Sequence, residues 1–195
     1  MKIGLTQRVL FHKKRAYDSI EHGWYSYLKG HTLFPIANRI DQDFKQLAES
    51  LDCLIITGGD DSVIRRTCEI KLATAMMLLR KPIIGICHGC FLLTDLLGGL
   101  VEPIDNHMDT FHEVTYMNSL HSVNSFHTQY IKTAHNSATI LATDADGNCE
   151  AWIDITCNIA GVVWHPERMK KPWLPEEINK LLTHSLNTSI DTERL

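Results

Sequence analysis

Cys87 is the residue of this sequence best placed to act as a nucleophile. It stands in the pattern G-x-C-x-G at residues 85–89, directly after the apolar, β-branched run 83–86 and before a second apolar run, 91–97. A strand, a sharp turn and a helix with a nucleophile at the turn form a nucleophile elbow, here built on cysteine. The helix N-terminus favours the thiolate, and the crowded turn requires the two glycines.

The base and its orienting group are predicted in the segment His165-Pro166-Glu167. A cysteine nucleophile needs a base within hydrogen-bond reach and a third group that orients this base. The segment follows the strongest apolar run of the second half, 159–164, so it lies where a strand leaves the sheet. Pro166 fixes the backbone between the two side chains. We therefore predict a triad of Cys87, His165 and Glu167.

A glycine pair supplies the remaining part of such a site. Gly58 and Gly59 follow the apolar run 51–57, and glycine lets the backbone approach a tetrahedral intermediate closely. The backbone N–H groups of Gly59 and of His88, the residue after the nucleophile, are the predicted oxyanion hole. The chemistry of this set is acyl transfer.

Other interpretations of these residues remain open at this point. Cys87 and Cys90 are spaced as a redox C-x-x-C pair, and a single histidine among the eleven present is often structural. The elbow, the His-Pro-Glu segment and the glycine pair together favour acyl transfer. Cys90 is then interpreted as a packing residue, or alternatively as an oxidation partner. His107 and His112 lack a recognised metal spacing, so we predict no metal and no cofactor.

Length and charge restrict the class of protein. The 195 residues suit one domain, which we place at 1–188 with a polar tail at 189–195. The net charge of −4 gives no electrostatic case for nucleic acid or an anionic membrane. No apolar run reaches the roughly 18–20 residues of a membrane helix. The first residues lack the apolar region of a signal peptide, so we predict a cytoplasmic protein whose six cysteines are reduced.

The first half of the chain alternates between strand and helix patterns. This order predicts an α/β three-layer sandwich with a mainly parallel central sheet and helices on both faces. The predicted strands are 2–6, 31–36, 51–57 and 83–86, and the predicted helices are 17–28, one opening at 41–47, 68–80 and 91–97.

The second half is rich in short β patterns separated by turn residues. The predicted strands are 112–116, 122–127, 138–143, 149–154 and 158–164, followed by a closing helix at 173–186.

Five motifs give the chain a resemblance to a known family. They are T-G-G-D at 57–60, G-I-C-H-G at 85–89, V-N-S-F-H-T-Q at 123–129, D-G-N-C-E-A at 146–151 and G-V-V-W-H-P-E at 161–167. With them the chain resembles the class I glutamine amidotransferases. Within that group it is most similar to the stand-alone γ-glutamyl hydrolases, a peptidase C26-like type that includes γ-glutamyl-γ-aminobutyrate hydrolase.

The resemblance implies a reaction and a set of roles. Cys87 attacks a γ-glutamyl carbonyl, a γ-glutamyl thioester forms, an amine or ammonia leaves, and water releases glutamate. His165 shuttles the protons and Glu167 orients it. Ser125, Phe126 and His127 are implied to line the glutamyl site.

One departure from the family bears on the substrate. Many members carry Gln four residues after the nucleophile, where it helps to hold the amino-acid end of glutamine. Here the residue is Phe91, which can neither donate nor accept those hydrogen bonds. Either free glutamine is not the main substrate, or its amino-acid end is held in another way.

Arg8 and the basic run 12–15 follow the first strand, on the edge where ligands of open α/β sheets bind. The run is a solvated loop or an anion-contacting loop. We predict that the amine part of the substrate is anionic, with Arg8 among the substrate-binding residues. A γ-glutamyl nucleotide amidate from a surface-polysaccharide pathway and γ-glutamyl amino acids, including γ-glutamyl-γ-aminobutyrate, fit this prediction.

Three hypotheses for the whole protein follow. The first is a stand-alone hydrolase of a small γ-glutamyl amide, since a chain of this length has no room for a synthetase beside this domain. The second is a glutaminase subunit that delivers ammonia to a separate synthase, with Gly58-Gly59 and the segment 105–111 as interface candidates. The third is a non-catalytic cysteine sensor of the same fold.

Overall fold

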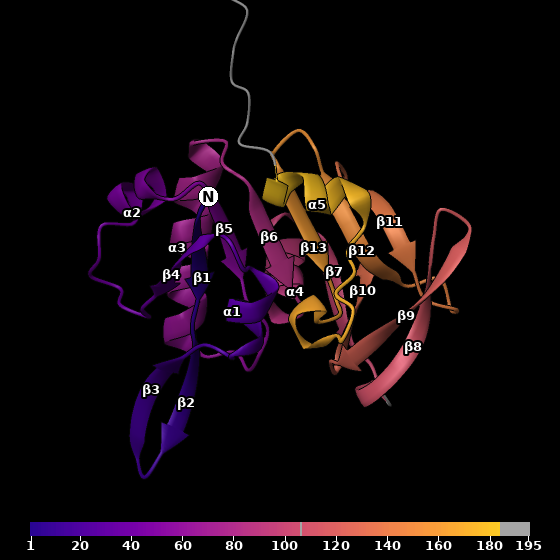
Figure 1. Cartoon of the computed structure of the whole chain (residues 1–195), viewed down its shortest axis with the longest axis horizontal. Helices are drawn as coiled ribbons and strands as arrows, with labels where there is room; N and C mark the ends of the chain where they lie inside the picture. Colours follow the sequence, from indigo (N-terminus) through magenta and orange to yellow (C-terminus); the bar gives the residue numbers. More distant parts are fainter. Residues whose placement is uncertain (106, 184–195) are drawn as a thin grey trace, which may run out of the picture.

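One sheet with a parallel and an antiparallel half organises the chain (Figure 1). The computed structural model describes residues 1–105 and 107–183, and within these ranges the sheet has eleven strands. The parallel half runs in the order β4 (Thr32–Ile36), β1 (Lys2–Thr6), β5 (Cys53–Ile56), β6 (Ile83–Ile86) and β13 (Ile159–Val162). The last three strands are fully buried. This burial explains why they are continuous apolar runs instead of alternating patterns.

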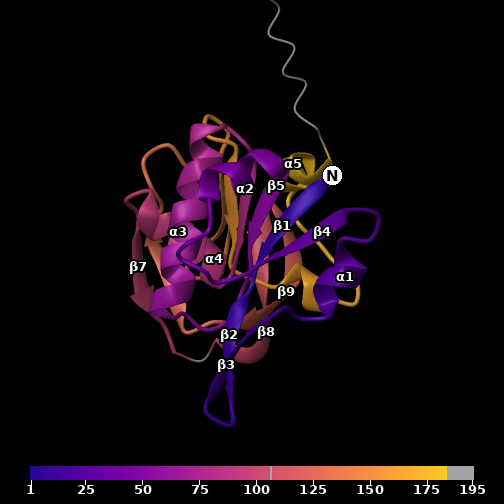
Figure 2. The same cartoon turned by 90° about the vertical axis from the view of Figure 1, so that its left-hand side faces the viewer.

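Helices cover both faces of this half. Figure 2 shows α3 (Val63–Leu78) and α4 (His88–Leu96) on one face, and α1 (Gly23–Tyr27) and α5 (Glu176–Thr183) on the other. The predicted α/β architecture with helices on both faces is therefore confirmed. Another helix, α2 (Phe44–Ser50), packs against α3.

Capping side chains explain two helix boundaries that the sequence patterns misplaced. The Ser62 hydroxyl accepts from the backbone N–H of Arg65 at 3.4 Å, so α3 begins well before the predicted residue 68. Asp43 accepts from the N–H of Gln46 at 2.9 Å, so it is the N-cap of α2 and not part of its first turn.

The antiparallel half extends the sheet beyond β13. β12 (Cys149–Asp154) pairs with β13, and β11 (Thr139–Thr143), β8 (Met108–Tyr116) and β9 (Ser119–Phe126) follow in that order. The β-rich second half is thus confirmed. Two strands of this sheet escaped prediction, β7 (Leu100–Pro103) and β10 (Gln129–Thr133), which pair with each other. Both are short and partly exposed, so neither leaves a clear apolar pattern.

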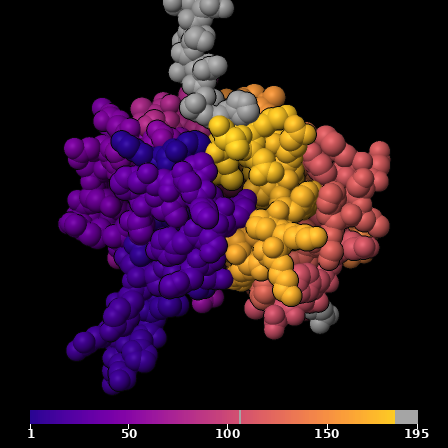
Figure 3. Space-filling model, in the orientation of Figure 1, coloured from indigo at the N-terminus to yellow at the C-terminus, as the bar shows by residue number. Residues whose placement is uncertain are grey.

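A β-hairpin projects from the body of the molecule (Figure 3). It joins β2 (Arg8–His12) and β3 (Arg15–Ser19), and its two turn residues, Lys13 and Lys14, have φ of 46° and 62°. Positive φ at both positions is the geometry of a two-residue hairpin turn. The basic run 12–15 is therefore a hairpin tip.

The hairpin corrects the predicted helix at 17–28. Residues 15–19 pair with β2 over five positions, with Tyr17 opposite Leu10, and only Gly23–Tyr27 is helical. The helical pattern was misleading at its start, where pairing with a neighbouring strand overrides local propensity.

The C-terminal predictions are only partly covered. The closing helix, predicted at 173–186, is observed as α5, which begins later, at Glu176, and is described as far as Thr183. The remainder of that prediction and the tail at 189–195 lie outside the described residues. Within the described part of the chain, no helix is long and apolar enough to span a membrane.

Candidate active site

Cys87 occupies a strained turn between β6 and α4. Its φ and ψ are 51° and −106°, a conformation that a non-glycine residue rarely adopts. Close steric contacts explain why both residues flanking Cys87 in the pattern are glycine. A Cβ on Gly85 would lie 2.4 Å from the carbonyl oxygen of Gly89, and a Cβ on Gly89 would lie 2.1 Å from that of Ile56. The spacing G-x-C-x-G therefore follows from close contact between the strand, the turn and the neighbouring strand β5.

The pairing of β6 with β13 brings His165 to the same edge. The two strands are parallel with Ile86 opposite Val162, and the N–H of Cys87 donates to the carbonyl of Val162 at 2.9 Å. His165 follows three residues later. Its backbone is held by Asn124, whose side chain accepts from the N–H and donates to the carbonyl, both at 2.8 Å.

The side chains of His165 and Glu167 are hydrogen bonded in the buried interior. Nδ1 of His165 lies 2.6 Å from Oε1 of Glu167, and both side chains are at most 2% exposed. Burial lowers the pKa of His165, but hydrogen bonds with Cys87 and Glu167 and the negative charges of both outweigh it and raise the pKa to about 9. A carboxylate only accepts, so Nδ1 carries a proton and Nε2 is left for Cys87.

The glycine pair after β5 lies against the imidazole. A Cβ on Gly58 would stand 2.2 Å from Cε1 of His165, so no other residue fits without displacing the ring. Gly59 has φ of 116°, which also favours glycine. Gly59, His88, Cys87 and His165 line one pocket of about 370 Å³. The predicted oxyanion donors thus border the same pocket as Cys87 and His165.

Most of the predicted substrate-binding residues also line this pocket. Arg8, Phe91, Phe126 and His127 do so, and the ring of Phe126 meets that of His165 edge-on at 5.7 Å. Ser125 does not line it, because its hydroxyl donates to the carbonyl of His107 at 2.6 Å. The basic run 12–15 is also absent from the lining.

Two charged residues that the sequence did not reveal, Glu21 and Arg168, lie beside Arg8. Glu21 accepts from Nε and Nη2 of Arg168 at 2.8–3.1 Å and is 3.5 Å from Nη2 of Arg8. The Arg168 guanidinium lies 4.8 Å from the centre of the Phe126 ring. Arg168 directly follows the His-Pro-Glu segment, which is a signal that could have been used. Nothing in the sequence pattern links Glu21 to it.

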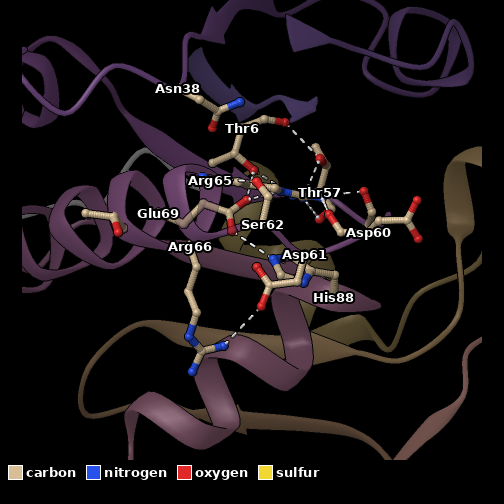
Figure 4. Close-up of polar contacts among 12 residues, drawn as sticks. Thr6, Asn38, Thr57, Asp60, Asp61, Ser62, Arg65, Arg66, Glu69 and His88 are labelled. Atoms are coloured by element: carbon tan, nitrogen blue, oxygen red, sulfur yellow. Dashed lines mark hydrogen bonds and ion pairs between the residues drawn. The ribbon is translucent and has the colours of Figure 1, made fainter. Parts of the chain in front are cut away.

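A buried polar network that sequence reasoning also missed lies behind the nucleophile (Figure 4). We call Thr6, Arg65, Glu69 and His88 the paired cluster. Glu69 accepts from Oγ1 of Thr6 at 2.7 Å, from Nε of Arg65 at 2.8 Å and from Nε2 of His88 at 2.8 Å. Burial raises the pKa of Glu69, but the hydrogen bond from His88 and the charge of Arg65 outweigh it, so the pKa lies below its usual value.

A second group, which we call the histidine cluster, contains the buried His127 and Glu150 and the partly buried His107 and His112. The three rings lie 5.1–6.2 Å apart. Within the described residues, both ring nitrogens of His112, Nε2 of His127 and Oε2 of Glu150 have no hydrogen-bond partner. Nε2 of His112 lies 3.3 Å from Oε2 of Glu150 without hydrogen-bond alignment. No group of three or more His, Cys, Asp or Glu in the described chain could hold a metal ion.

The comparisons with known proteins agree with this architecture. The model of the class-I glutamine amidotransferase family matches residues 15–184. The chain therefore belongs to the class I glutamine amidotransferases. A solved glutamine amidotransferase from Thermotoga maritima shares the fold, with a TM-score of 0.65 at 13% identity over 85% of this chain and 76% of that chain.

Two curated relatives are informative about the branch of the family. A γ-glutamyl-CDP-amidate hydrolase from Campylobacter jejuni is 27% identical over 86% of this chain and 90% of its own length. A glutamine-hydrolysing GMP synthase from Corynebacterium ammoniagenes is also 27% identical, but its match covers 70% of this chain and only 27% of the synthase.

Proposed function

We propose that the protein hydrolyses a γ-glutamyl amide through a γ-glutamyl thioester on Cys87. The observation that carries this proposal is the buried His165–Glu167 hydrogen bond of 2.6 Å beside an elbow cysteine. A base with an orienting carboxylate next to a nucleophile is the arrangement that covalent acyl transfer requires. The similarity to a γ-glutamyl-CDP-amidate hydrolase over 90% of that protein supports the same reaction class.

The reaction proceeds in two halves. The Cys87 thiolate attacks the amide carbon, and the carbonyl electrons move to oxygen, where the N–H groups of Gly59 and His88 receive the negative charge. The C–N bond then breaks as Nε2 of His165 gives its proton to the departing amine nitrogen. His165 next takes a proton from water, the water oxygen attacks the thioester, and the C–S bond breaks to give glutamate and the free thiolate. A raised pKa of about 9 keeps His165 protonated for the first half.

The glutamyl end of the substrate is assigned to the side of the pocket that contains His127. Burial lowers the pKa of His127 to about 4, so the ring is neutral at pH 7. Nδ1 lies 2.7 Å from the carbonyl of Gln129, which only accepts. The proton therefore sits on Nδ1 and leaves Nε2 as an acceptor. An acceptor suits the α-ammonium group, and it takes over part of the role that Phe91 cannot perform.

The amine end is assigned to the side of Arg8 and Arg168. The departing nitrogen must lie next to His165, and Phe126 and Arg168 follow from there, since Phe126 contacts both the imidazole and the guanidinium. The guanidinium groups of Arg8 and Arg168 share one carboxylate, Glu21, so positive charge is in excess within this group of three, while Asp60 and Asp61 line the pocket as well. An anionic amine part fits this charge. A γ-glutamyl nucleotide amidate, the class to which the γ-glutamyl-CDP-amidate in the name of the Campylobacter relative belongs, is the substrate class that we propose.

A panel of γ-glutamyl amides tests both assignments. Glutamate release would be measured for a nucleotide amidate, γ-glutamyl-γ-aminobutyrate, a neutral γ-glutamyl alkylamide and glutamine, together with the mass of Cys87 peptides. We expect acylation of Cys87, turnover without another protein, and preference for the phosphate-bearing amide. Arg8→Ala should lower kcat/KM for that amide by about tenfold or more and leave the neutral amide unchanged, since a hydrogen bond to a charged group contributes about 1.5–3 kcal/mol.

A glutaminase subunit of a synthase is the second candidate, favoured by the match to GMP synthase. In that case glutamine should be hydrolysed slowly by the isolated chain and rapidly with a synthase partner. Rapid turnover of the phosphate-bearing amide by the chain alone would contradict it. If no γ-glutamyl compound acylates Cys87, both enzymatic proposals fail and the cysteine sensor remains.

A further inference from the structure

We propose that Arg65, Glu69 and the His88 side chain are positioning residues that aim the two backbone donors of the oxyanion hole. This inference rests on the proposed function, because it assigns a purpose to the paired cluster within the same acyl transfer. None of the three side chains supplies a donor to the substrate in this proposal. They act on the peptides that do.

Arg65 fixes the direction of the Gly59 N–H. Its guanidinium donates to the carbonyls of Gly58 at 3.4 Å and Asp60 at 3.0 Å, and also to that of Thr57. A trans peptide points its C=O and N–H in opposite directions. The peptide that joins Gly58 to Gly59 turns its carbonyl inward to Arg65, so its N–H is directed away from Arg65, and Gly59 borders the pocket. Donation from a cation also polarises that peptide and strengthens its N–H as a donor.

Glu69 connects this loop to the second donor. Its Oε1 accepts from Nε of Arg65, and its Oε2 accepts from Nε2 of His88. His88 is the first residue of α4, so anchoring its side chain restrains the peptide whose N–H follows Cys87. The Glu69 carboxylate therefore holds both side chains, Arg65 and His88, that restrain the two backbone donors. Figure 4 shows Arg65, Glu69 and His88 together, with dashed lines for the contacts of the Glu69 carboxylate.

Stability alone is a poor reason for such an arrangement. The side chains of Arg65 and Glu69 are 0% and 1% exposed. Apolar residues of similar volume are often neutral or stabilising in place of a buried ion pair, because removing two charges from water is costly. Orientation of the two backbone donors accounts for a buried ion pair at this position.

Two variants test the proposal. Glu69→Gln keeps the shape of the side chain but places an amide among three donors. His88→Ala removes the anchor while retaining the backbone N–H, at a side chain that is 10% exposed. We expect kcat to fall about tenfold to a hundredfold in each, with KM within about threefold, because oxyanion donors act mainly in the transition state and loss of one costs about 10²–10³.

Arg66→Gln is the matched control. This neighbouring arginine lies on the same helix, is 38% exposed and pairs with Asp95 at the surface. It should retain the kcat of the parent protein.

The decisive measurement compares two reactions of Cys87. Acylation by the best γ-glutamyl amide of the panel forms an oxyanion, whereas alkylation by iodoacetamide does not. Slower acylation with an unchanged alkylation rate in both variants would support the proposal. Equal acylation rates in parent and variants, or parallel loss of both reactions with the fold, would overturn it. A parent protein that is alkylated but never acylated would instead remove the proposed function, and this inference with it.

Discussion

Two largely buried polar clusters flank the nucleophile, and they differ in how completely their groups are hydrogen bonded. In the paired cluster, both oxygens of Glu69 accept from neighbouring side chains at 2.7–2.8 Å. In the histidine cluster, four buried nitrogen or oxygen atoms have no partner among the described residues. The first cluster belongs to the parallel half of the sheet and the second to the antiparallel half.

The difference separates two tasks that an acyl-transfer site must perform. A fully satisfied network is rigid, which suits groups that must hold two peptide donors in one orientation. An unpartnered buried acceptor is costly by about 1–3 kcal/mol, and the cost is relieved when a ligand supplies a donor. We therefore associate the paired cluster with the chemistry and the histidine cluster with recognition of the glutamyl end.

The largest expected effect is on stability, when the cation of the paired cluster, Arg65, is replaced. Arg65→Met would leave the buried carboxylate of Glu69 without its ion-pair partner. We expect the free energy of unfolding to fall by about 3–5 kcal/mol, the usual result of removing one member of a buried pair. Urea titration measures it. If the free energy of unfolding fell by less than about 1 kcal/mol, the paired cluster would not be held together more strongly than the histidine cluster.

Removing the acceptor of the histidine cluster should act on binding. His127→Leu deletes Nε2, which we assign to the α-ammonium group, so KM should rise by about tenfold or more while kcat changes less. Steady-state kinetics on the best γ-glutamyl amide measures both. His112→Leu is the comparison variant from the same cluster, since His112 does not line the active-site pocket. A change in kcat alone for His127→Leu would contradict the assignment.

The dependence of stability on pH should separate His127 from His165. Burial lowers the pKa of His127 to about 4 from 6.5, so the unfolded state binds more protons in this window and stability falls as the pH drops through it. Burial also opposes the charge of His165, but Cys87 and Glu167 raise its pKa to about 9. Its contribution is therefore full below pH 6.5 and is lost as the pH rises toward 9.

Unfolding titrations at pH 4.5, 6.5 and 9 check both signs. His127→Leu should flatten the acid side only, and Cys87→Ala should flatten the alkaline side only. If His127→Leu flattened the alkaline side, or Cys87→Ala the acid side, other titrating groups would dominate the dependence of stability on pH.

The smallest effect is expected at the carboxylate of the histidine cluster. Burial raises the pKa of Glu150, and its Oε2 has no hydrogen-bond partner within the described chain. Glu150→Gln should therefore change the free energy of unfolding by less than about 1 kcal/mol, since it removes a poorly satisfied charge. The same substitution at Glu69 is the contrast. A cost at Glu150 equal to that at Glu69 would abolish the distinction between the clusters.

The candidate triad could be predicted because its signals are local. The positive φ of Cys87 and the close contacts of Gly85 and Gly89 require those residue types at those positions. His165 and Glu167 are separated by one proline, so their contact is also nearly local. The helix expected at 17–28 failed for the opposite reason, because pairing with β2 decided its conformation.

The sequence alone determined the elbow, the glycines around it and the alternation of strand and helix, because each depends on steric limits within a few residues. Only the tertiary structure decided which charged groups surround the nucleophile. Glu69 looks like a member of an ordinary i, i+4 surface pair with Arg65, yet it meets Thr6 across 63 residues of chain. Glu21 meets Arg168 across 147. Such contacts leave no periodic or compositional trace, since the packing of the sheet and its helices brings them together.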